Sequence, residues 1–112
     1  MPQIISDILY EYAQGIKKIF GANLKKIFLY GSYARGDYNE SSDVDILILV
    51  DLDDAKIKQK MSELADYTFE MELKCELQLS PIAINEEQFE YWSDTLPFYK
   101  NVLKEGIQIA DR

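Results

Sequence analysis

The residues best suited to chemistry are a Gly-Ser pair and two aspartates that follow it. Gly31 and Ser32 come directly after an apolar segment. After a spacer over positions 33–42, Asp43 and Asp45 begin a strongly apolar run. A glycine turn lets backbone N–H groups approach phosphate oxygens, and two aspartates one residue apart on a strand point to the same face, where both can bind metal ions. The pattern therefore indicates a site for a nucleoside triphosphate and a divalent metal.

The composition removes most rival chemistries. The chain has no histidine, which excludes Ser–His and Cys–His catalysis in their usual forms and most zinc sites. Its net charge of −8 argues against general nucleic-acid binding, because such proteins normally present a basic stripe. The charge does not argue against a nucleotide, whose phosphates a local metal ion and one arginine can neutralise. What remains is carboxylate and metal chemistry.

Neither a membrane span nor a signal segment is expected. No apolar run approaches the length of a membrane span, and the residues after Met1 lack the basic start and apolar core of a signal peptide. Cys75 is the single cysteine, so no internal disulfide can form. The expected location is the reducing cytoplasm.

The hydrophobic pattern predicts a single domain over residues 1–112. A chain of 112 residues is long enough for one core and too short for two. Helical spacing of apolar residues and capping signals predict helices over residues 3–20, 32–36, 57–68, 86–92 and 97–104. Apolar runs predict strands over residues 25–30, 43–50 and 75–84, with a short fourth strand at 107–109. The fold class is therefore α/β (α+β), with a small mixed sheet of three or four strands flanked by helices.

The strand over residues 43–50 carries its two acids on one face. Asp43 and Asp45 share that face with Leu47 and Leu49, while the residues at even positions are all apolar. Such a strand is expected at the centre of a sheet that is covered on both sides. Two carboxylates at its start are therefore predicted to serve a site rather than solubility.

At these residues the chain resembles the nucleotidyltransferase superfamily that includes DNA polymerase beta and kanamycin nucleotidyltransferase. The resemblance is carried by residues 31–37 (GSYARGD) and 42–45 (SDVD). Within the superfamily the chain is similar to the minimal nucleotidyltransferases, which are short single-domain prokaryotic members. Residues 96–106 are also similar to the end of such proteins, so the resemblance covers nearly the whole chain.

The resemblance implies a third carboxylate on the strand after the intervening helix. The matching position is Glu76, although Glu70 and Glu72 lie close in sequence and remain alternatives. Asp43, Asp45 and Glu76 are then the expected catalytic and metal-binding residues. Together they are expected to hold two Mg²⁺ ions.

The resemblance also implies how ATP, the expected substrate, would be held. Gly31 and Ser32 would hold its β- and γ-phosphates. Arg35 is expected either to offer its guanidinium to the phosphates or to pair with Asp37 and brace the loop. The expected reaction is a nucleotidyl transfer in which a hydroxyl acceptor displaces pyrophosphate.

For the acceptor, the resemblance implies a partner protein. A chain this short is not expected to carry an acceptor-binding domain of its own. In the minimal group the partner is an all-helical HEPN-domain protein encoded nearby, usually a toxic ribonuclease, which receives AMP on a tyrosine. The first hypothesis is therefore a Mg²⁺-dependent adenylyltransferase antitoxin. Two alternatives remain: a non-catalytic module that neutralises a HEPN partner by binding, and nucleotidyl transfer to a small molecule such as an aminoglycoside.

A dense group of aromatic residues over positions 89–99 has two interpretations. It is expected to pack in the core of the terminal helices, or alternatively to form an exposed surface for a partner. Core packing is the preferred interpretation of these aromatic residues.

Overall fold

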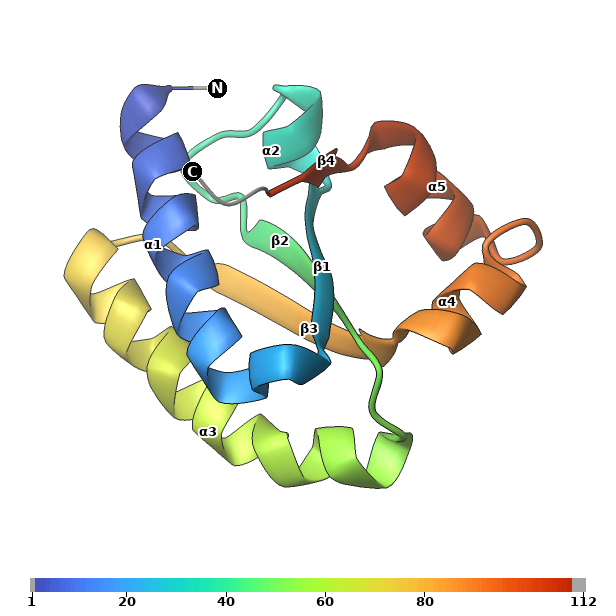
Figure 1. The fold of residues 1–112 in the computed structure, drawn as a ribbon. Coiled ribbons are helices and arrows are strands. Elements are labelled where there is room, and N and C mark those ends of the chain that lie inside the picture. Colours follow the sequence, from blue (N-terminus) through green and yellow to red (C-terminus); the bar gives the residue numbers. More distant parts are fainter. Residues whose placement is uncertain (1, 110–112) are drawn as a thin grey trace.

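A computed structural model describes residues 2–109 as a four-stranded sheet with helices on both faces (Figure 1). The strands are β1 Leu24–Tyr30, β2 Val44–Val50, β3 Leu79–Asn85 and β4 Ile107–Gln108. The helices are α1 Gln3–Phe20, α2 Ser32–Arg35, α3 Asp54–Cys75, α4 Glu86–Trp92 and α5 Pro97–Glu105, with a 3₁₀ turn η1 at Gly21–Asn23. Within the described range, no helix is both long and apolar enough to cross a membrane.

The sheet is mixed, as the sequence predicts, and its strand order is β3-β2-β1-β4. β1 pairs antiparallel with both β2 and β4, whereas β2 pairs parallel with β3, which follows it through α3. β3 therefore lies at an edge, the position that tolerates Pro81. The register brings Tyr30 of β1 and Ser80 of β3 to either side of Asp45 on the central strand β2.

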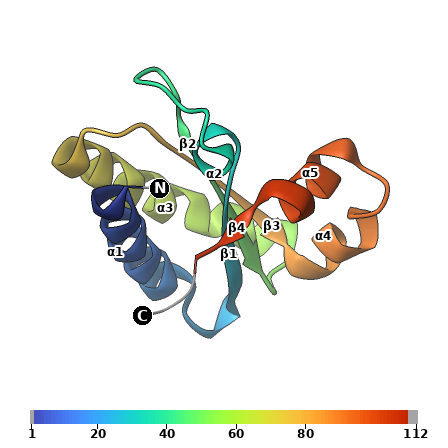
Figure 2. The same cartoon turned by 90° about the horizontal axis from the view of Figure 1, so that it is seen from above.

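The two faces of the sheet are covered by different helices (Figure 2). Even-numbered residues of β2 point into a core that they share with α1 and α3. Leu47 and Leu49 point to the opposite face, where they pack with Phe89 of α4 and Val102 of α5. Asp45 alternates in step with these leucines and therefore belongs to the α4–α5 face. The predicted strand parity is confirmed.

The layer formed by α1 and α3 is the larger hydrophobic core. Leu9, Ile16 and Leu64 are almost fully buried there, and burying one such side chain stabilises the fold by about 1.5–3 kcal/mol. A buried hydrogen bond of 2.7 Å joins the hydroxyl groups of Tyr12 and Thr68 across the two helices. Both polar groups are thereby satisfied inside the core.

Helices α3 and α4 each begin at a side-chain cap. The side chain of Asp53 accepts a hydrogen bond of 2.9 Å from the N–H of Lys56 at the start of α3. Asn85 accepts one of the same length from the N–H of Gln88 at the start of α4. Each cap satisfies a donor that the helix itself leaves unpaired.

The end of α3 differs from the prediction. The helix continues to Cys75, and β3 begins only at Leu79. Glu76 therefore follows the helix instead of lying on a strand: it has φ 56°, and its N–H donates to the Glu72 carbonyl at 2.9 Å. The alternating residues of this segment fit a strand, but Met71 continues the buried face of the helix and burial extends α3.

Candidate active site

A tight turn at Gly31 connects β1 to the short helix α2. Gly31 has φ 74°, a left-handed conformation that glycine adopts at little cost. Its carbonyl accepts hydrogen bonds from the N–H groups of Ala34 and Arg35, both at 3.1 Å. Because the first N–H groups of a helix have no partner within that helix, the turn and Ser32 offer donors to a ligand.

The turn is packed directly against the second aspartate. A Cβ atom built on Gly31 would collide with the carboxylate oxygen Oδ2 of Asp45. Position 31 therefore favours glycine for its backbone conformation, and a side chain there would also have to displace the Asp45 carboxylate. This contact joins the two halves of the sequence motif in space.

A cleft of about 370 Å³ opens beside this contact, a volume within the range of small-molecule sites. Four of the residues predicted from the sequence line it: Gly31, Ser32, Arg35 and Asp45. Helix α5 lines it with Phe98, Asn101, Val102 and Glu105. Hollows of similar size between α1 and α3 and beside β4 contain neither aspartate.

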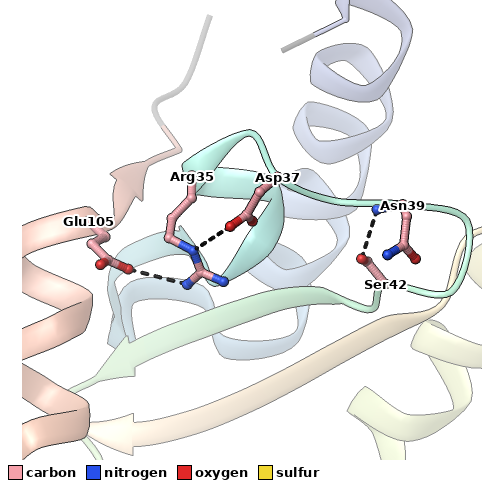
Figure 3. A network of polar contacts seen from close by, with 5 residues as sticks. All are labelled: Arg35, Asp37, Asn39, Ser42 and Glu105. Atoms are coloured by element: carbon pink, nitrogen blue, oxygen red, sulfur yellow. Dashed lines mark hydrogen bonds and ion pairs between the residues drawn. The ribbon is translucent and has the colours of Figure 1, made fainter.

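Asp43 lies two residues before Asp45, in the step just before β2 begins at Val44. It is exposed, whereas Asp45 is half-buried. The loop that leads to it is braced by a hydrogen bond of 3.0 Å from the N–H of Asn39 to Oγ of Ser42 (Figure 3). A fixed loop holds Asp43 near its neighbour on the strand.

The pKa values of the cleft show a concentration of negative charge. Burial raises the pKa of the Asp45 carboxyl above its ordinary value, the charge of Asp43 raises it further, and Arg35 lowers it. Burial, together with the charge of Asp45, raises the pKa of Tyr30 to about 12. The Tyr30 hydroxyl therefore stays protonated at neutral pH and can donate a hydrogen bond to a ligand.

The two aspartates suit a magnesium ion that also binds a triphosphate. Mg²⁺ is commonly held by one or two carboxylates together with substrate phosphates. The repulsion between Asp43 and Asp45 is relieved when a cation lies between them. Among residues 2–109, no group of three acidic or cysteine side chains is arranged to hold a metal by itself. The described residues therefore fit an ion that shares its coordination with the nucleotide.

Among residues 2–109, the predicted third carboxylate, Glu76, does not form a metal-holding group with the two aspartates. It is an exposed residue at the end of α3. The residue paired with Asp45 on β3 is Ser80, which offers a hydroxyl instead of a carboxylate. The expectation that Glu76 lies on this strand is wrong, because α3 continues to Cys75, beyond its predicted end at residue 68.

Arg35 lines the cleft, but two carboxylates engage its guanidinium (Figure 3). Its Nε donates to Oδ2 of Asp37 and its Nη1 to Oε2 of Glu105, both at 3.3 Å. The hydrogen bond to Asp37, and then the one to Glu105, raises the pKa of Arg35. Of the two roles predicted for Arg35, the structure contains the brace with Asp37, and adds Glu105 to it.

The sequence motif does not identify the α5 side of the cleft. Phe98 packs edge-on against Tyr30, with 5.4 Å between the ring centres, and Asn101 follows it at helical spacing. That spacing is visible in the sequence, but it does not reveal which face of the sheet the helix covers. The aromatic group divides between the two predicted places, since Phe89 is buried and Tyr91 is exposed.

The nucleotidyltransferase domain family matches residues 9–109. The protein adenylyltransferase MJ0604 of Methanocaldococcus jannaschii, a name assigned provisionally, is 38% identical over 99 residues, which cover 86% of this chain and 88% of that protein. The matched range contains every residue that lines the cleft.

Solved structures share the fold. A provisionally named nucleotidyltransferase from Sulfolobus solfataricus has a TM-score of 0.62 at 20% identity, with 96% of this chain and 80% of that chain covered. A chain from the complex of tri-AMPylated HEPN toxin with MNT antitoxin from Shewanella oneidensis has a TM-score of 0.52 at 16% identity, with 96% and 73% covered. At these identities the likeness shows the fold alone.

Proposed function

The chain belongs to the nucleotidyltransferase domain family, and from this premise we propose that it transfers AMP from ATP to a hydroxyl group in the cleft beside Gly31 and Asp45. The enzyme class follows from the family. One observation carries the choice of site: the packing of Gly31 against the Asp45 carboxylate. That contact puts a turn suited to phosphate beside a carboxylate suited to a metal ion.

The turn and the aspartates would hold the triphosphate. The N–H groups of Gly31 and Ser32 bind the β- and γ-phosphates, and Asp43 and Asp45 bind Mg²⁺. The metal would offset the charge of the triphosphate and stabilise the leaving pyrophosphate. The acceptor oxygen bonds to the α-phosphorus, the bond from that phosphorus to pyrophosphate breaks, and the hydroxyl proton is released. A second ion and a role for Glu76 stay predictions from the sequence.

Helix α5 would hold the nucleoside on the opposite side of the cleft. The ring of Phe98 offers an apolar surface for the base, and its edge-on contact with Tyr30 fixes its place. The amide of Asn101 can both donate and accept hydrogen bonds at the base or the ribose. The substrate would thus be held between α5 and the strands β1 and β2.

Arg35 would change partners when the nucleotide binds. Its guanidinium is exposed and held by Asp37 and Glu105 at 3.3 Å, contacts that contribute little in water. A phosphate offers the same planar fork a stronger, doubly charged partner. Both predicted roles of Arg35 would then apply, one to the free protein and the other to the complex.

The proposed acceptor is a tyrosine hydroxyl of a HEPN-domain partner encoded nearby. The complex from Shewanella oneidensis supports this choice, because its description names a HEPN toxin that carries AMP groups beside an MNT antitoxin. The relative MJ0604 supports it too, because its provisional name describes transfer of AMP to protein. The chain would then act as an antitoxin by modifying its partner.

Labelled ATP tests the reaction. The chain, Mg²⁺ and the neighbouring HEPN protein are incubated with ATP labelled either at the α- or at the γ-phosphate. Label from the α-position is expected on the partner, label from the γ-position is not, and a chelator should abolish the transfer. An unlabelled partner would contradict adenylylation of that protein, and γ-label would indicate phosphorylation instead.

A toxicity assay separates catalysis from neutralisation by binding. The chain with Asp45→Asn is expected to lose its ability to relieve the toxicity of the partner, because binding alone leaves the toxin unmodified. If this variant protects cells as well as the unchanged chain does, the non-catalytic alternative is correct. Asp94→Asn, an exposed aspartate in the loop before α5, is the matched control.

A further inference from the structure

Helix α3 is apolar on two sides, although only one of them faces the core. Its inner side buries Ile57, Leu64 and Met71. On its outer side Phe69 is 60% exposed and Leu73 is 67% exposed. A helix that packs on a single core normally carries polar residues on the opposite side, so the outer side of α3 needs a separate explanation.

The exposed apolar residues of α3 form a continuous ridge. Met61, Ala65, Phe69 and Leu73 follow one another at intervals of four residues and are all exposed, and such a row is the unit by which helices pack together. The adjacent helix α1 differs, because within its described residues the large exposed apolar side chain is Ile4 alone. We call these four residues the α3 ridge. Because α1 does not share this exposure of apolar side chains, the ridge is a candidate contact surface.

The order of residues along the α3 ridge is self-complementary. Ala65 and Phe69 lie two positions either side of residue 67, and Met61 and Leu73 lie six positions either side of it. If a second α3 ran antiparallel across the same point, each Phe69 would pack over the small Ala65 of the other copy. Each Met61 would pack against a Leu73. A surface of this kind fits a two-fold axis, where the same patch serves both subunits.

The charges at the two ends of the ridge repeat this symmetry. Lys58 and Glu76 each lie nine positions from residue 67, at the N- and C-terminal ends of the ridge. Both are exposed, and within residues 2–109 neither takes part in an ion pair. Antiparallel pairing would bring each Lys58 to the Glu76 of the second copy. Opposite charges would then flank the apolar contact at both ends.

We propose that the α3 ridge is the interface of a symmetric homodimer. α3 covers the face of the sheet opposite to α4 and α5 (Figure 2). Pairing through it leaves the cleft of each copy open to nucleotide and acceptor.

Sedimentation equilibrium of the purified chain over a series of concentrations tests the dimer. The expected mass is twice that of the 13.0 kDa chain, and Phe69→Asp should reduce it to that of one chain, because the charge would be buried at the centre of the contact. Tyr91→Asp on α4, where the side chain is 75% exposed, is the control and should leave the dimer intact. A single-chain mass for the unchanged protein, or a dimer that survives Phe69→Asp, overturns the proposal.

An exchange of charges tests the antiparallel register. Lys58→Glu and Glu76→Lys should each raise the dissociation constant by about tenfold, since both symmetric pairs change from attraction to repulsion. The double variant should restore the original constant, because the pairs form again with reversed signs. If the double variant is as weak as the two single changes together, these residues do not meet and the proposed register is wrong.

Discussion

The two faces of the sheet differ in how completely they are closed. On the face of α1 and α3, the buried residues form one large core that extends from Leu9 to Leu79. On the face of α4 and α5, the buried cluster consists of Leu47, Leu49, Phe89 and Val102, and the sheet beyond it borders the cleft. The closed face provides stability, and that stability lets the open face keep two repelling carboxylates beside an open cleft.

Successive residues of β2 point alternately to the closed face and to the open face. Val44 and Ile46 are fully buried on the closed face, while Asp45 between them points to the open face. A single strand therefore anchors the core and presents the proposed metal ligand. Substitutions on the closed face should therefore change stability, whereas substitutions on the open face should change activity.

The largest expected effect is on activity, from Asp45→Asn. The rate of AMP transfer should fall roughly a hundredfold or more, because a charge that stabilises the transition state is lost. Steady-state rates with labelled ATP measure this. Asp94→Asn, an exposed aspartate outside the cleft, is the control and should keep full activity. Equal losses in both variants would show that the open face has no special role.

On the closed face, Leu64→Ala should lower the free energy of unfolding and leave the rate of AMP transfer by the folded protein unchanged. Leu64 is 1% exposed, and replacing such a leucine by alanine costs about 2–5 kcal/mol of the free energy of unfolding. Urea denaturation measures the loss, and the folded fraction should retain its kcat. The same substitution at Leu103, which is 52% exposed, should cost much less. A loss of kcat in folded Leu64→Ala protein would contradict the assignment of stability to the closed face and activity to the open face.

A smaller effect is expected from Phe98→Ala on the wall of the cleft. The KM for ATP should rise roughly threefold to tenfold, because an aromatic contact of this kind contributes about 0.5–1.5 kcal/mol. Little stability should be lost, since Phe98 is 39% exposed. Initial rates over a range of ATP concentrations give KM and kcat separately. An unchanged KM would show that Phe98 of α5 does not contribute to nucleotide binding.

The smallest expected effect is a gain in stability from Asp45→Asn. The pKa of Asp45 is raised in the fold, so its ionisation destabilises the folded state: stability is highest below the ordinary pKa of an aspartate and falls as the pH rises through the raised value. At neutral pH the variant should be more stable by less than about 1 kcal/mol, because solvent screens a half-exposed group.

The pH dependence checks this assignment. Urea denaturation of the unchanged chain and of Asp45→Asn should give converging free energies of unfolding as the pH falls below the ordinary pKa, because the protonated acid is then neutral, as the amide is. A variant that is less stable than the unchanged chain at neutral pH would indicate that Asp45 supports the fold.

The core elements and the parity of β2 follow from the sequence because local periodicity determines both. The alternation from Val44 to Val50 specifies which residues face each layer, and Asp53 and Asn85 signal the helix starts that are observed. Gly31 could be identified because it and Ser32 come directly after the apolar run that forms β1. These signals all lie within a few residues of the feature they predict.

The place of Glu76 and the α5 wall could not be predicted, because both depend on tertiary packing. The segment around Glu76 fits a strand locally, but the burial of Met71 against the core extends the helix to Cys75, directly before Glu76. Phe98 and Asn101 reach the cleft because α5 packs through Val102 onto the leucines of β2. The residues next to Met71 and Val102 in the sequence do not signal either packing contact.

NMR of the ¹⁵N-labelled chain tests most directly whether the nucleotide binds in the cleft beside Gly31 and Asp45. Mg²⁺ and a non-hydrolysable ATP analogue are added, and the amide shifts are followed residue by residue. The largest shifts are expected at Gly31, Ser32 and Asp45, a further shift is expected at Asn101, and the amides of the α1–α3 face should be unaffected. Largest shifts around Lys17 and Lys25, which line the hollow on the α1 side, would contradict it.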